Sequence, residues 1–76
     1  VFYFVSFDVA SGEPAHGHVG EGSQRPSRDA KIWLEPHVHV AHQGRFGNRD
    51  VRRIVHIVES RRQQLLEDWN AYKGSI

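Results

Sequence analysis

The last third of the chain carries an apolar stripe that a long amphipathic helix explains. The stripe consists of Val51, Ile54, Val55, Val58, Leu65, Leu66, Trp69 and Tyr72. These positions recur at intervals typical of one helix face, with no proline or glycine between them. We expect the helix to start within residues 46–50, where Gly47 or Asn48 can cap it and Asp50 meets the free N–H groups of the first turn. Gly74 ends the helix.

A stripe of this kind must be buried against another layer, and the first half of the chain has the composition of strands. The expected strands are residues 1–9, 15–19 and 30–34, and residues 37–41 continue as an irregular or edge strand. Residues 20–29 hold two glycines, a proline and four charges, which indicates an exposed loop. The sequence therefore predicts an α+β fold. A small, mainly antiparallel three-stranded sheet packs on one long C-terminal helix.

The length of the chain limits what this fold can bury. With 76 residues and no cysteine, we expect one domain spanning residues 1–76, without disulfides or cysteine-based metal sites. A three-stranded sheet with one helix leaves a face uncovered, so we expect a homo-oligomer with Phe2, Phe4 and Trp33 at its interface. No apolar run approaches the roughly 18 residues of a membrane span. We therefore expect a cytoplasmic protein that makes no membrane contact.

Two pairs of histidines are the clearest candidates for chemistry. His16 and His18 are two residues apart, and His37 and His39 repeat that spacing. Residues two apart in a strand point to the same face, with Cα atoms about 6.6 Å apart. Four imidazoles would suit a divalent metal such as zinc. Histidines that only satisfy local hydrogen bonds are the more common outcome, so the first expectation is that the domain needs no cofactor, with a metal as the alternative.

The same histidines can also act without a metal. A histidine pair can give and take a proton near neutral pH, as a nuclease or phosphodiesterase requires. The candidate cluster for such chemistry is His16, His18, Glu13, Arg45 and Arg49, in which an arginine holds the phosphate. Further arginines on the helix could contact nucleic acid, but the formal net charge is only +1. A solvated helix face is the more ordinary reading of those arginines.

Several motifs, taken in order, resemble the DUF4160 family. The matching segments are Phe2-Tyr3-Phe4, EPAHGHV at residues 13–19, AKIWLEP at 30–36, GRF at 44–46 and LLEDWNAY at 65–72. Within this pattern His16 and His18 carry the family signature, whereas His37 and His39 lie outside it. Family members usually carry one more strand ahead of the aromatic one, so the resemblance implies an unpaired edge at the strand that begins at Val1, which favours pairing with another copy.

The resemblance implies a bacterial protein whose biochemical role is undefined. DUF4160 genes often stand beside another small conserved gene, as in toxin–antitoxin pairs. The resemblance thus favours a non-enzymatic, oligomeric interaction or regulatory module with a protein partner from a neighbouring gene. The alternatives are the histidine-based nuclease or phosphodiesterase, with or without a metal, and a purely structural oligomer.

Overall fold

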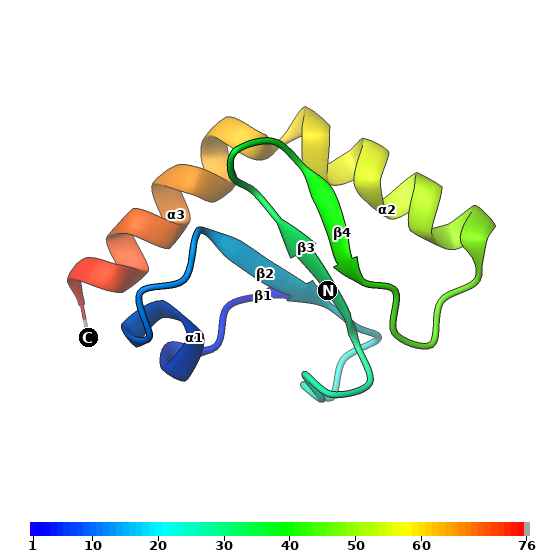
Figure 1. Ribbon diagram of the computed structural model, residues 1–76, viewed down its shortest axis with the longest axis horizontal. Helices are drawn as coiled ribbons and strands as arrows, with labels where there is room; N and C mark the ends of the chain where they lie inside the picture. The colour runs from blue at the N-terminus through cyan, green and yellow to red at the C-terminus, as the bar shows by residue number, and fades with distance from the viewer. Residues whose placement is uncertain (76) are drawn as a thin grey trace.

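The computed structural model describes residues 1–75, which form one antiparallel sheet and a layer of helices (Figure 1). The elements, in chain order, are β1 (Phe2–Tyr3), α1 (Ser6–Ala10), β2 (His16–Val19), β3 (Ala30–Trp33), β4 (His39–His42), α2 (Asn48–Ser60) and α3 (Arg62–Gly74). The strands follow one another in the sheet in the order β1-β2-β3-β4. Each neighbouring pair is antiparallel, which confirms the α+β class and the antiparallel sheet.

The prediction of three strands was wrong, because the chain returns along β3 to form a fourth. Pro36 follows β3, where it cannot donate to a ladder. After this interruption, His39 pairs with Trp33, and Val40 pairs with Ile32. The register shifts between Lys31 and Ile32, so β4 is attached through an irregular ladder. The expectation of an irregular or edge strand over residues 37–41 is thus confirmed for residues 39–41, which belong to β4.

The prediction of a single strand over residues 1–9 was also wrong. Only Phe2 and Tyr3 pair with β2, and the chain then turns into the short helix α1. In α1 the Val9 N–H donates to the Val5 carbonyl at 3.1 Å. This turn buries Val9 in the core and leaves Phe7 78% exposed. The departure from the sheet also brings Asp8 beside His16 and His18 of β2.

The expected long helix is interrupted, so that two helices of 13 residues each meet at Arg61. Arg61 has φ −116° and ψ 11°, outside helical geometry. The next residue, Arg62, donates from Nε to the Leu34 carbonyl at 2.8 Å and from Nη2 to the Pro36 carbonyl at 3.3 Å. These bonds tie the junction to the β3–β4 connection, and Figure 1 shows α2 and α3 arching over one face of the sheet. Among the described residues, no helix has the length and apolar character needed to cross a bilayer.

The core lies between this helical layer and the sheet. Its buried members are Val9, Ala15, Ala30, Ile32, Leu34, Val38, Val58 and Trp69. The expected alternation of β3 is confirmed, because Ala30 and Ile32 are fully buried while Lys31 and Trp33 are partly exposed. The prediction that the apolar stripe of residues 51–72 packs into the core is confirmed, although α2 and α3 share that stripe.

Candidate functional site

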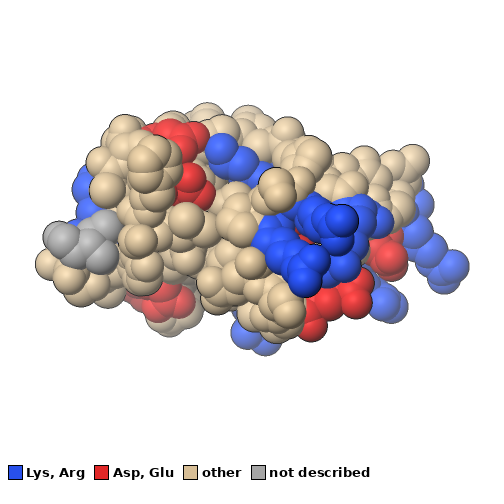
Figure 2. Space-filling view, turned by 90° about the horizontal axis from the view of Figure 1, so that it is seen from below, with Lys and Arg blue, Asp and Glu red and all other residues tan. Residues whose placement is uncertain are grey.

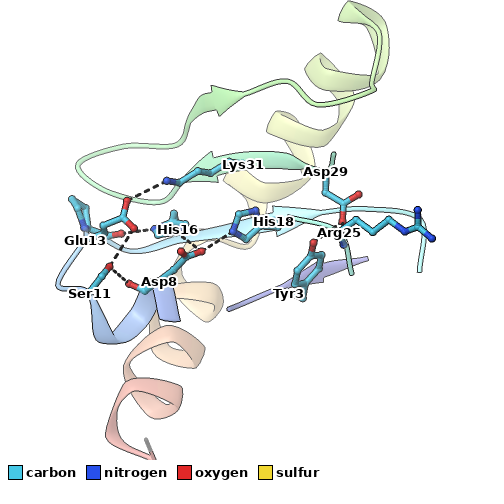
Figure 3. Close-up of polar contacts among 10 residues, drawn as sticks. Tyr3, Asp8, Ser11, Glu13, His16, His18, Arg25, Asp29 and Lys31 are labelled. Atoms are coloured by element: carbon cyan, nitrogen blue, oxygen red, sulfur yellow. Dashed lines mark hydrogen bonds and ion pairs between the residues drawn. The ribbon is translucent and has the colours of Figure 1, made fainter. Parts of the chain in front are cut away.

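Two histidines of β2 and one aspartate of α1 form a buried polar cluster (Figure 3). His16 and His18 are two residues apart in a strand, so their rings lie on the same side of the sheet. The Oδ2 atom of Asp8 lies 3.2 Å from His16 Nε2 and 2.8 Å from His18 Nε2. The exposed fraction is 1% for His16 and 4% for His18. One carboxylate oxygen thus meets two imidazoles in a site largely closed to solvent.

The backbone determines which nitrogen of His16 carries a proton. Nδ1 of His16 lies 2.9 Å from the Pro14 carbonyl oxygen, which can only accept, so Nδ1–H donates this bond. Nε2 of a neutral His16 therefore presents a lone pair toward Asp8. The 3.2 Å separation is within ion-pair range, but Nε2 does not meet the geometry of a hydrogen bond there and has no hydrogen-bond partner within residues 1–75.

His18 holds the Asp8 carboxylate more directly. Its Nε2–H donates to Asp8 Oδ2 at 2.8 Å, which leaves Nδ1 buried without a hydrogen-bond partner. Burial disfavours the charged form of Asp8, but the hydrogen bond from His18 and the close approach of His16 outweigh it. The pKa of the Asp8 carboxyl is consequently below its ordinary value.

Aromatic rings enclose both imidazoles. Trp33 and Trp69 lie 5.0 and 5.3 Å from the His16 ring, and Tyr3 stacks on His18 at 5.5 Å, measured between ring centroids. The glycine between the histidines faces the opposite side of the sheet. There the ring of Phe2 fills the space that a side chain at position 17 would need. This packing explains why a glycine separates the two histidines.

Glu13 belongs to a second layer of polar contacts beside the cluster. Lys31 Nζ donates to Glu13 Oε1 at 3.1 Å, and this bond, more than any other contact, lowers the pKa of the Glu13 carboxyl. Ser11 Oγ lies within hydrogen-bonding distance of both the Asp8 carbonyl and Glu13. These contacts fix the turn between α1 and β2, which sets the position of Asp8 relative to the histidines.

The cluster can do two kinds of chemistry. A carboxylate between two imidazoles can pass a proton from one ring to the other. Asp8, His16 and His18 can also each offer one ligand atom to a metal ion, because those three atoms lie within 4.8 Å of one another. The burial of both histidines favours holding a small ion over contacting a large substrate.

A family model described as a domain of unknown function (DUF4160) matches residues 1–70. The chain belongs to this family. The match confirms the resemblance drawn from the motifs, and it includes Asp8, His16 and His18. No curated protein and no solved structure matched the chain.

The second histidine pair of this DUF4160 domain lies apart from the cluster. The Trp33 ring lies between His16 and His39, with centroid distances of 5.0 Å and 6.2 Å. His37 packs on His39 at 4.7 Å, and Nδ1 of His39 takes part in a hydrogen bond with the His37 carbonyl. The structure therefore brings together His16 and His18 of the four predicted ligands, and adds Asp8.

The predicted arginines of the DUF4160 domain also lie away from the histidines. Arg45 Nη2 is 3.7 Å from Asp29 Oδ1, and Arg45 Nε is 3.8 Å from Glu21. Arg49 is exposed in the first turn of α2. Figure 2 shows Lys and Arg side chains gathered on the face seen from below. A hollow near Arg45 is lined by Ser27, Arg28, His42, Gly44 and Arg45, and includes neither His16 nor His18.

Asp29 forms a second buried polar centre in the DUF4160 domain. The Tyr3 hydroxyl donates to Asp29 Oδ2 at 2.5 Å, and the Arg25 N–H donates to the same oxygen at 3.0 Å. The hydrogen bond from Tyr3, then that from Arg25, lowers the pKa of the Asp29 carboxyl. Burial and the hydrogen bond to Asp29 raise the pKa of Tyr3 to about 12. This centre joins β1 to the β2–β3 loop.

The three residues predicted for an oligomer interface have intramolecular partners. Phe2 packs edge-to-face against Phe4 at 5.6 Å, and Phe4 packs against Trp69 at 5.4 Å. Trp33 is partly exposed on the sheet, with Lys31 Nζ 4.5 Å from the centre of its ring. Phe2 and Phe4 thus contribute to the core. Of the three residues, only Trp33 lies on the sheet face opposite the core.

Asp8 is the site residue that sequence reasoning missed. Interpreting residues 1–9 as one strand gave Asp8 no relation to His16 and His18. The available signal is its charge, because Asp8 is the one charged residue in a run that is otherwise aromatic and apolar apart from Ser6. A buried charge needs a partner, and the nearest histidines in the sequence are the two of β2.

Ionisation of Tyr3 is expected to destabilise the domain as the pH rises from about 10, the pKa of an unfolded tyrosine. Because folding raises this pKa to about 12, the stabilisation is complete below about pH 10 and is lost as the folded group ionises. Urea titrations across this window should show a steeper fall in unfolding free energy for wild type than for Tyr3→Phe. Tyr72→Phe should show the same fall of unfolding free energy with pH as wild type. If Tyr3→Phe also shows that fall, Tyr3 is not the group responsible.

Proposed function

We propose that this DUF4160 domain is a small, non-enzymatic interaction module of a bacterial regulatory pair of toxin–antitoxin type. The observation that carries the proposal is an aromatic side chain left in solvent. Phe7 is 78% exposed, although six other residues of the segment 1–10 are partly or fully buried. An aromatic side chain with this exposure is a common anchor for a protein partner.

The surroundings of Phe7 support a docking role. The short helix α1 packs beside the C-terminal end of α3 (Figure 1). An open hollow between them is lined by Ser6, Phe7, Val9, Ala10, Gly12 and Lys73. This lining is largely apolar, with one positive charge from Lys73. Its chemistry suits a partner segment that presents an apolar side chain and a carboxylate.

The partner we propose is the small protein encoded beside the DUF4160 gene. Self-association is the other way to cover exposed surface, because β1 is an edge strand that pairs with β2 alone. We place the partner at Phe7 because the side chains of Phe2 and Phe4, next to that edge, already pack inside the domain.

The enzyme alternative has less support from the geometry. A histidine-based nuclease needs its histidines and an arginine in one cleft that admits a phosphodiester. His16 and His18 are buried, and Arg45 lines a separate hollow. An interaction module needs no such cleft, which is why we prefer it.

Phe7→Ser is expected to abolish partner binding without unfolding the domain. Exposed substitutions of this kind change stability by about 0.5 kcal/mol or less, whereas losing an interface anchor weakens binding by at least about tenfold. The test is co-expression of the chain with the neighbouring gene product, followed by calorimetric titration of the purified pair. Ile57→Ser, at a 48% exposed apolar position on α2, is the matched control and should bind like wild type.

Two results would overturn this proposal. The first is a Phe7→Ser domain that binds the neighbouring protein as tightly as wild type does. The second is metal-stimulated cleavage of RNA by the wild-type chain that Asp8→Asn removes, which would support the enzyme alternative. Sedimentation of the chain alone tests whether a second copy of the chain covers Phe7. A mass above that of the 8.7 kDa monomer that returns to the monomer mass in Phe7→Ser would identify the second copy as the partner.

A further inference from the structure

We propose that Asp8, His16 and His18 form a binding site for a divalent transition metal ion, with Zn²⁺ as the ion whose ligand preferences they match best. Two imidazole nitrogens and one carboxylate oxygen are common zinc ligands, and three protein ligands leave a fourth position for water. This inference is independent of partner binding at Phe7. It uses the polar cluster that the interaction module leaves without a role (Figure 3).

The spacing of the three ligand atoms suits a small ion. Zinc bonds of 2.0–2.1 Å at tetrahedral angles hold ligand atoms about 3.3 Å apart. The Asp8 Oδ2 atom is 3.2 Å from His16 Nε2 and 2.8 Å from His18 Nε2. The first distance already matches, and the second needs to lengthen by about half an ångström. The Asp8 side chain, on the short helix α1, is 20% exposed, whereas His16 and His18 are buried in β2, so Asp8 is the ligand with the most room for this adjustment.

The tautomer of His16 is a second, independent observation. A histidine that binds a metal through one ring nitrogen normally donates a hydrogen bond from the other, often to a backbone carbonyl. His16 Nδ1 makes that bond to the Pro14 carbonyl at 2.9 Å. The remaining nitrogen, Nε2, is buried without a hydrogen-bond partner and points toward the Asp8 carboxylate. A bare lone pair facing a carboxylate oxygen is repulsive, so a positive charge between the two atoms would stabilise this geometry.

A proton and a metal ion are the two candidates for that positive charge. A proton on Nε2 would serve His16 alone, and with either charge Nδ1 of His18 stays buried without a hydrogen-bond partner among the described residues. A metal ion would bind all three residues, and it would tie α1 to β2 at the point where the chain leaves the sheet. Rings of Trp33, Trp69 and Tyr3 exclude water from the histidine side of the site, which strengthens electrostatic attraction there.

The chain contains its own control for this proposal. His37 and His39 repeat the spacing of His16 and His18, but among the described residues only His16 and His18 come together with a carboxylate as a group of three possible metal ligands. A site defined by spacing alone would use either pair, whereas a site defined by Asp8 uses only the first. Substituting His37 and His39 therefore distinguishes metal binding at the Asp8 site from the general affinity of histidines for metals.

The first test measures Zn²⁺ binding to the untagged, metal-stripped full chain by competition with a chromogenic chelator, with stoichiometry from native mass spectrometry. We expect one Zn²⁺ per wild-type chain. Asp8→Asn and His18→Gln should each weaken binding by more than the roughly 100-fold limit of second-shell substitutions. The double variant His37→Gln/His39→Gln should bind within about twofold of wild type, since second-pair residues make no contact with the site. Binding that survives Asp8→Asn, or that is lost in the double variant, overturns the proposal.

The second test uses the wild-type chain and so does not depend on whether a variant folds. Co²⁺ bound by two imidazoles, a carboxylate and water in tetrahedral geometry absorbs visible light strongly, while the octahedral aqua ion absorbs weakly. We expect the strong spectrum to appear on adding one equivalent of Co²⁺ and to vanish when Zn²⁺ displaces it. A weak octahedral spectrum, or one that needs several equivalents, shows surface binding only and contradicts the proposed site.

Discussion

Replacing Trp69 with alanine is expected to unfold a large part of the population at 25 °C. Trp69 is 4% exposed and is the buried anchor of α3. Its ring contacts Phe4 edge-to-face at 5.4 Å and His16 at 5.3 Å, so it joins the helical layer both to the N-terminal segment and to the polar cluster. Removing a buried tryptophan costs about 3–5 kcal/mol. A core of this size supplies a net stability of roughly the same amount.

Urea unfolding followed by circular dichroism measures this effect. Trp69→Phe keeps an aromatic ring in the same cavity and should lose distinctly less stability. Ile57→Ala removes an apolar side chain at a 48% exposed position, so its effect should stay near about 0.5 kcal/mol. A Trp69→Ala domain that is still cooperatively folded, with a loss below about 1 kcal/mol, would show that α3 is not held through this side chain.

The parts of the fold that sequence predicts are those that depend on regular periodicity. The stripe from Val51 to Tyr72 predicts a helical layer at the correct place, because burial on one face requires that spacing. Alternation predicts β3 and the burial of Ile32. The apolar series skips positions 61 and 62, where two arginines stand, but it stays in phase on both sides of them, so it does not by itself predict the break. The break is stabilised by bonds from Arg62 to carbonyls of a distant segment, and such tertiary contacts have no local signature.

In the candidate site, too, local periodicity predicts some of the residues, whereas others depend on the tertiary fold. A period of two predicts that His16 and His18 share a face, and they do. Their partner Asp8 could not be predicted, because its position depends on the chain leaving the sheet after Tyr3. Local preference favoured continuing that strand, since aromatic and β-branched residues are enriched in strands. The composition of residues 20–29 predicts an exposed loop, and Asp29 lies within it. Its burial comes instead from the close approach of other backbone segments, which local composition does not encode.

That close approach leads to the second large prediction: Gly44→Ala is expected to destabilise the domain by more than about 2 kcal/mol. Gly44 has φ +65°, in the left-handed region that costs other residues about 1–2 kcal/mol. A Cβ atom there would also lie 2.6 Å from the Arg28 carbonyl oxygen and 2.8 Å from the Ala30 nitrogen. Both are backbone atoms, one at the first residue of β3 and one just before it, so they cannot rotate away as a flexible side chain could. The Arg45 N–H donates to the Arg28 carbonyl at 3.1 Å, and the substitution would force this contact apart.

Alanine substitutions at three glycines distinguish the cost of backbone strain from the cost of the steric clash at Gly44. Gly74 has nothing within 4 Å and no positive φ, so alanine there should leave stability unchanged or raise it, by up to about 1 kcal/mol. Gly12 has φ +82° but open space around it, so alanine there should cost the left-handed strain alone. Gly44→Ala carries both effects and should be the most destabilised in urea titrations. Equal losses at Gly12 and Gly44 would mean that the β4–α2 loop moves away from β3 at little cost, and the burial of Asp29 would then need another explanation.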